Sequence, residues 1–149
     1  MDKDFLHYAE SVELHNLGFD EPCIGFYPSK GSNVVFHYAK DCLTDEYRIH
    51  MSNNVLDWVP APLYQQAFRW FRDNYNLYGC IEFKPHIQRW SFDINDVTLS
   101  QKQFEDMQVI NRLVAEPPCG SFEEAQLGCL KELISRVKHI KHVEEEVHV

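Results

Sequence analysis

The 149-residue chain has little of what most catalytic and metal-binding motifs need. Its five cysteines form no Cys-x-x-Cys pair, and its six glycines are too scattered for a phosphate-binding loop. No apolar run approaches the roughly 20 residues that span a bilayer. The 14 Lys and Arg face 23 Asp and Glu, so a net charge of −9 opposes non-specific binding of nucleic acid. We therefore expect no cofactor, no membrane partner and no non-specific nucleic-acid partner.

The first residues and the cysteines predict the same compartment. Met1-Asp-Lys-Asp is acidic and is not followed by an apolar run, unlike a secretory signal. An odd number of cysteines is typical of thiols in a reducing cytosol. We expect a cytoplasmic protein. Its length predicts a single globular domain over residues 1–142, followed by a frayed acidic tail over residues 143–149.

The clearest structural signal is an amphipathic helix in the middle of the chain. Pro62 suits a first helical turn, where its missing N–H has no helical partner to lose. Apolar residues then recur at helical spacing, and polar residues lie on the opposite side. The apolar stripe is Tyr64, Ala67, Phe68, Phe71 and Tyr75, and the polar side is Gln65, Arg69, Arg72 and Asn76.

Turn residues and periodicity predict the remaining elements. Helices are expected over 4–17, capped by Asp4 and ended by Gly18, over 100–115, and over 121–142, where Ser121 and Glu124 form a capping box. Strands are expected over 23–27, 34–38, 47–51, 79–83 and 88–94, with 34–38 and 47–51 forming one hairpin and the last two another. Residues 53–59 read as irregular. In the last helix the buried side is expected to comprise Phe122, Ala125, Cys129, Leu130, Leu133, Ile134, Val137 and Ile140.

Short connections between strands favour antiparallel pairing. The predicted fold class is α+β, a mostly antiparallel sheet of about four to five strands with three to four helices packed mainly on one face. We expect Phe68, Phe92 and Leu133 to share one apolar interior.

Three segments together resemble a known group of sequences. They are Leu17-Gly-Phe-Asp-Glu-Pro-Cys23, the stretch from Ala61 to Arg72, and the stretch from Ser121 to Ile134. In this order they are similar to uncharacterised short proteins of Bacteroidetes genomes and of their phages and mobile elements. The resemblance implies a phage or prophage setting, in which small proteins of the host-cell cytosol often block host defences or assist replication. It implies no activity, ligand or catalytic residue.

The segment 61–92 is the only locally basic part of the chain, with four Lys and Arg against two Asp and Glu. Arg groups match phosphate or carboxylate geometry, and an indole can stack on a base. A small anionic ligand such as a nucleotide could therefore bind Arg69, Trp70, Arg72, Lys84, His86 and Arg89. The alternative is that Arg69 and Arg72 form the solvated face of an amphipathic helix and that Trp90 is simply core.

Two histidine groups are weaker candidates. His37, Arg48 and His50 share the non-core face of the first predicted hairpin, where they could bind an anion or transfer a proton, or simply form a solvated strand face. His139, His142 and His148 with Glu146 lack the spacing of a structural zinc site, so we expect no metal.

The sequence thus favours a non-catalytic cytosolic protein that binds a partner. The alternatives are a small-molecule binder that captures an anion and a small enzyme with a His/Arg site. An acidic surface can occupy a basic site on another protein or imitate nucleic acid. A homodimer through exposed aromatic residues such as Trp58 or Tyr78 stays open.

Overall fold

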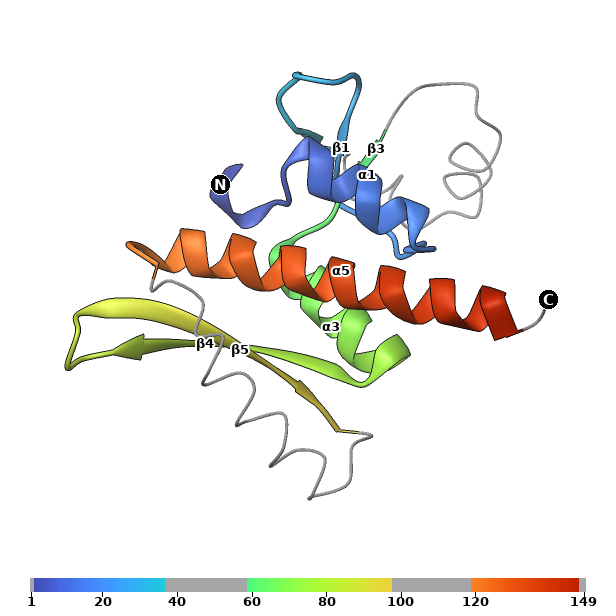
Figure 1. Cartoon of the computed structure of the whole chain (residues 1–149). Coiled ribbons are helices and arrows are strands. Elements are labelled where there is room, and N and C mark those ends of the chain that lie inside the picture. The colour runs from blue at the N-terminus through green and yellow to red at the C-terminus, as the bar shows by residue number, and fades with distance from the viewer. Residues whose placement is uncertain (1, 37–58, 98–118, 148–149) are drawn as a thin grey trace. The chain divides into compact units, whose positions relative to one another are not determined.

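The computed structural model describes residues 2–36, 59–97 and 119–147 (Figure 1). It is an α+β protein whose described strands all pair antiparallel, as predicted. The described strands lie in two sheets, whereas we expected one. The chain divides into two compact units, residues 1–67 and 68–149. The predicted helix over 100–115 and the predicted strand over 47–51 lie outside the described residues, and the prediction of one domain stays a prediction.

The first unit begins with a short 3₁₀ helix, η1 (Asp2–Asp4), and the helix α1 (Tyr8–Asn16). His7, not Asp4 as predicted, occupies the N-cap position of α1, and its side chain makes no capping hydrogen bond. The helix starts late because the chain at residues 5–6 pairs with residues 62–63. Gly18 follows the helix with φ of +98°, as expected for a left-handed cap. The N–H of Phe19 bonds to the carbonyl of Leu14, which completes a Schellman motif.

A three-stranded sheet follows, with β1 (Gly25–Tyr27) between β2 (Val35–Phe36) and β3 (Val59–Ala61). We predicted that residues 53–59 are irregular. Val59 instead begins strand β3, because Val59–Ala61 pairs with β1. The core of this unit contains Phe5, Tyr27 and Ala61, against which Tyr8, Val34, Val59 and Leu63 pack.

The helix α3 (Tyr64–Tyr75) lies where the central stripe predicted it. Pro62 precedes the helix by two residues and is buried, so it is not in the first turn as expected. Just before the helix, the N–H of Leu63 donates a 3.1 Å hydrogen bond to Oε1 of Gln66. Tyr64, Ala67 and Phe71 are buried, and the predicted polar side is mostly exposed.

The second unit contains a long hairpin, β4 (Leu77–Lys84) and β5 (Arg89–Asp96), and the helix α5 (Phe122–Val147). The hairpin agrees with the prediction. Helix α5 packs on both strands (Figure 1) and ends at Val147, where we expected an end near His142. No helix in the described part of the chain is long and apolar enough to cross a membrane.

Two glycines allow α5 to approach the hairpin closely. A Cβ at Gly79 would lie 2.7 Å from the sulfur of Cys129, with Leu133 and Phe68 each at 3.4 Å. A Cβ at Gly128 would lie 2.7 Å from the ring of Phe92. Phe68 and Leu133 therefore meet at Gly79, and Phe92 packs against the same helix, in agreement with the expected interior.

Candidate functional site

The N-terminus of α5 is held by the predicted capping box. The N–H of Glu124 donates to the hydroxyl of Ser121 at 3.1 Å, and the carboxylate of Glu124 accepts from the N–H of Gly120 at 2.7 Å. The first bond satisfies a backbone donor that a helix start leaves without a helical partner, and the second ties Glu124 to Gly120, the residue before the N-cap. The position of Phe122, the first residue of the helix, is therefore well defined.

The same segment is tied to the hairpin through its backbone. Trp90 and Cys119 exchange two hydrogen bonds, N–H of Trp90 to carbonyl of Cys119 at 3.1 Å and the reverse bond at 2.9 Å. The bridge is antiparallel, so Cys119 forms a short third row beside β5. It brings the start of α5 next to the end of the hairpin.

Three aromatic rings meet where the hairpin and the start of α5 come together. The rings of Phe83 and Trp90 lie 5.3 Å apart between centroids, and those of Trp90 and Phe122 lie 5.2 Å apart in an edge-to-face arrangement. Phe83 is 46% exposed and Phe122 is 41% exposed. We call Phe83, Trp90 and Phe122 the aromatic surface. Ile87, in the turn of the hairpin, is also exposed.

Sequence reasoning missed the aromatic surface. Phe122 was expected on the buried side of the last helix and Trp90 in the core, but Phe122 is exposed and Trp90 only half-buried. The pairing of Phe83 with Trp90 could have been predicted from the turn. If Lys84 and Arg89 are the residues that flank the turn, Phe83 and Trp90 are the next pair across the hairpin. The exposure of Phe122 depends on where α5 passes the hairpin, which the sequence does not give.

The six basic and aromatic residues proposed for an anionic ligand fall in two places. Arg69 and Arg72 lie on the exposed side of α3, and Tyr78 at the start of β4 is close enough to contribute to the raised pKa of Arg72. Lys84, His86 and Arg89 lie at the opposite end of β4, in or beside the turn. Tyr78 and Lys84 are six steps apart along the strand, a span of about 20 Å. One small ligand cannot contact both groups.

Trp70 is not available for stacking on a base. It is 5% exposed, and its ring packs against Phe71 and Tyr75 at centroid distances of 5.1 and 5.2 Å. Trp70 is therefore packed in the interior, and its place in the proposed ligand site is wrong.

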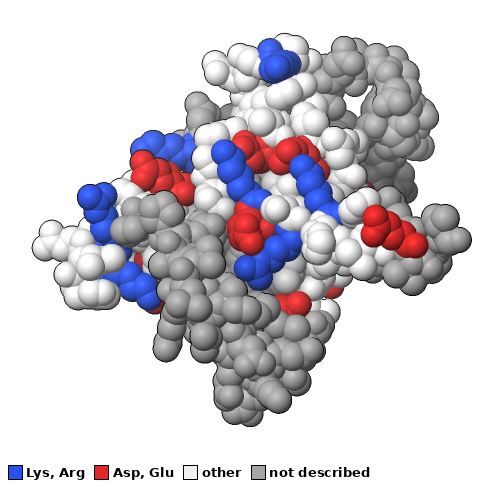
Figure 2. All heavy atoms as spheres, in the orientation of Figure 1, with Lys and Arg blue, Asp and Glu red and all other residues white. Residues whose placement is uncertain are grey.

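Of the four Lys and Arg side chains proposed for the anion site, two form ion pairs with neighbouring carboxylates. Arg72 donates to Asp73 at 2.8 Å, a bond that raises the pKa of Arg72 and lowers that of Asp73. Lys84 pairs with Glu82, and this hydrogen bond raises the pKa of Lys84. On the face drawn in Figure 2, basic and acidic side chains are likewise interspersed. These exposed pairs weaken the case for a concentrated positive site.

The histidine candidates have different outcomes. His37, Arg48 and His50 lie outside the described residues. On α5, Nε2 of His142 lies 3.4 Å from Oε1 of Glu146, and His139 is exposed, while His148 is outside the described part. Among the described residues, no group of three or more potential ligands could hold a metal ion.

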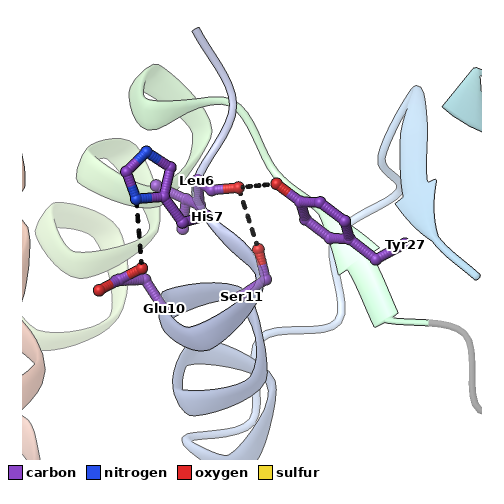
Figure 3. Close-up of polar contacts among 5 residues, drawn as sticks. All are labelled: Leu6, His7, Glu10, Ser11 and Tyr27. Carbon is purple, nitrogen blue, oxygen red and sulfur yellow. Dashed lines mark hydrogen bonds and ion pairs between the residues drawn. The ribbon is translucent and has the colours of Figure 1, made fainter. Parts of the chain in front are cut away.

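The first unit contains a second polar cluster, at the start of α1 (Figure 3). The carbonyl of Leu6 accepts a 2.6 Å hydrogen bond from the hydroxyl of Tyr27 and a 3.5 Å bond from Ser11. The carboxylate of Glu10 is buried and lies 3.9 Å from Nδ1 of the exposed His7. Burial, with Glu10 and Tyr27 nearby, raises the pKa of Tyr64 to about 12. The hydroxyl of Tyr64 therefore stays protonated well above neutral pH.

Comparison of the chain with models of protein families, with curated proteins and with solved structures gave no match. The resemblance to Bacteroidetes and phage proteins therefore stays a prediction, and any function has to be argued from the geometry above.

Proposed function

We propose that this protein acts by binding another protein, without catalysis, and that the aromatic surface is its contact. The observation that carries the proposal is the exposure of Phe83 and Phe122, at 46% and 41%, in a cluster with Trp90. Leaving large rings in water costs hydrophobic free energy, and contiguous apolar surface of this kind often marks an interaction site. Aromatic residues are also enriched among those that dominate binding energy.

The rigidity of this surface supports the proposal. The backbone of Trp90 is held by two hydrogen bonds to Cys119, and the backbone at the start of α5, which carries Phe122, is held by the cap at Ser121. Rings carried on an ordered backbone lose less conformational entropy on binding than rings on a mobile loop, so more of the contact energy becomes affinity.

The net charge of −9 favours a partner with a basic face, and charge complementarity accelerates association. The resemblance to phage and mobile-element proteins supports a partner in the cytosol of the host cell, such as a component of defence or replication. In this setting a small acidic protein would act by occupying a site on its target.

Site-specific photocrosslinking tests the proposal. A benzophenone amino acid replaces Phe122 in the full chain, expressed in a Bacteroidetes cell, and the matched control carries it at Val97, which is 58% exposed and outside the aromatic surface. We expect a discrete crosslinked protein from position 122 and none from position 97. The same adducts from both positions, or none from either, would contradict the proposal.

A thermal-shift screen of nucleotides separates this proposal from capture of an anionic ligand. We expect no nucleotide to raise the melting temperature. A rise that is lost in Arg69→Ala or Arg89→Ala would favour the ligand alternative and count against a purely protein-binding role.

A further inference from the structure

Strand β4 offers a long regular edge. Its eight residues pair with β5 in an unbroken register from Leu77 with Asp96 to Lys84 with Arg89, without a bulge or a proline. In the two-stranded sheet, β5 lies on one side of β4, and among the described residues no strand pairs with the other side. Natural sheets usually protect such edges with prolines, bulges or very short strands, because unpaired backbone groups there can pair with another chain.

The hydrogen-bond pattern shows which residues face this edge. Both backbone groups of Trp90 bond to Cys119, so they point away from β4. The pair of Phe83 and Trp90 is therefore a non-hydrogen-bonded pair, and in an antiparallel ladder such pairs alternate. The bond from the N–H of Val97 to the carbonyl of Asn76 gives the same phase at the other end of the hairpin. Gly79, Ile81 and Phe83 accordingly direct their N–H and C=O groups outward from the sheet.

We infer that this edge pairs with β4 of a second copy of this chain, antiparallel, with Ile81 opposite Ile81 of the partner subunit. In this register the outward backbone groups of Gly79 meet those of Phe83 of the partner subunit, and the two Ile81 residues bond to each other across the two-fold axis. The inference goes beyond the proposed function, since the contact is made by the backbone of β4.

The side chains of β4 are self-complementary in this register. Tyr78, which is 43% exposed, faces Lys84 of the partner subunit, a cation–π pair. Cys80 faces Glu82 of the partner subunit without a clash of charge. Shifting the register by one step in one direction places two Glu82 side chains opposite each other. The opposite shift requires Leu77, which is 2% exposed, to pair with Phe83.

Disulfide trapping tests both the dimer and its register. Residues 80 and 82 of the two subunits form non-hydrogen-bonded pairs, with Cα atoms about 4.5 Å apart, within the range that a disulfide spans. In Glu82→Cys, mild oxidation should give a covalent dimer whose peptide map links position 80 to position 82. The wild-type chain should give no link between two copies of Cys80. A monomer only, or a dimer linked through other cysteines, would overturn the inference.

The unaltered protein provides a second test that does not depend on a variant. The N–H groups of Gly79, Ile81 and Phe83 should exchange with solvent quickly in dilute solution and at least tenfold more slowly at concentrations where sedimentation shows a dimer. Those of Cys80 and Glu82, which face β5, should be protected in both conditions. A monomer at every concentration, with exchange rates that do not change, would overturn the inference.

A charge reversal supplies the matched control. Cys80→Glu places one new carboxylate opposite Glu82 of the partner subunit in each of the two symmetric pairs and should weaken dimerisation at least tenfold. Ser135→Glu adds the same charge at an exposed position of α5 and should leave the dimer constant unchanged. Equal effects of the two substitutions would show that net charge, and not the β4 edge, controls association. The photocrosslink from position 122 does not depend on this edge, so the two proposals can fail separately.

Discussion

The hydroxyl of Tyr27 donates a 2.6 Å hydrogen bond to the backbone carbonyl of Leu6, a residue 21 positions away in the sequence (Figure 3). The bond is buried and joins β1 to the segment that leads into α1. The ring of Tyr27 also packs edge-to-face on Tyr8, with centroids 5.6 Å apart. One side chain thus supplies both polar and apolar contacts between the helix and the sheet of the first unit.

Tyr27→Phe should keep the ring contact and lose the bond. The Leu6 carbonyl would retain only the longer bond from Ser11, so we expect a loss of about 1 kcal/mol in the free energy of unfolding. Urea unfolding followed by circular dichroism measures the change. Tyr75→Phe, at a half-buried position, is the control, and equal losses in the two variants would contradict a specific role for the Tyr27 bond.

Gly79→Ala should destabilise the second unit. The new Cβ would lie 2.7 Å from the sulfur of Cys129, which is buried, so strand and helix must separate or distort. Overpacking of this kind typically costs about 1–3 kcal/mol. In a Cys129→Ala background the obstacle is gone, and Gly79→Ala should cost clearly less there. Additive losses in the double-mutant cycle would show that the two positions do not touch.

Ser121→Ala should remove the cap of α5. The N–H of Glu124 would lose its 3.1 Å partner, and caps of this type contribute about 1 kcal/mol. Ser121→Asn offers an alternative side-chain oxygen and should restore most of the loss. The comparison uses midpoints of chemical unfolding. If alanine and asparagine behave alike, the hydroxyl of Ser121 does not stabilise the helix.

Stability should fall between about pH 10 and pH 12 partly because of Tyr64. Its pKa is raised to about 12 in the folded protein by burial and by the nearby Glu10 and Tyr27, while an unfolded tyrosine ionises near 10. The stabilisation is therefore complete below pH 10 and is lost as the pH rises through 12. Absorbance near 295 nm should show one late-titrating group that Tyr64→Phe removes. An unchanged titration curve in that variant would contradict the assignment.

Patterns confined to one element predicted the structure well. The stripe from Tyr64 to Tyr75 and the Ser121 capping box both appear where helical spacing placed them, since each depends on neighbours along the chain. The hairpin of β4 and β5 was predicted because its apolar residues alternate around one turn.

What the sequence could not give was the pairing of distant segments. Strand β3, which was not predicted, includes Pro60 and pairs with β1 at the edge of the sheet, where proline is tolerated. The candidate site changed for the same reason. Arg69 and Arg89 both belong to the basic segment 61–92, but they lie toward opposite ends of β4, a strand that spans about 20 Å between Tyr78 and Lys84. Trp70 was grouped with them although its ring is packed inside.

The most direct test of the proposed role measures whether the aromatic surface is needed for contact. A benzophenone amino acid at Ile87, which is 48% exposed beside this surface, reports binding, and Phe122→Ser removes one ring without touching the reporter. We predict that Phe122→Ser reduces the crosslinked product at least tenfold, whereas Val97→Ser leaves it unchanged and both variants stay folded by circular dichroism. The same yield of crosslinked product with and without the ring of Phe122 would contradict the account.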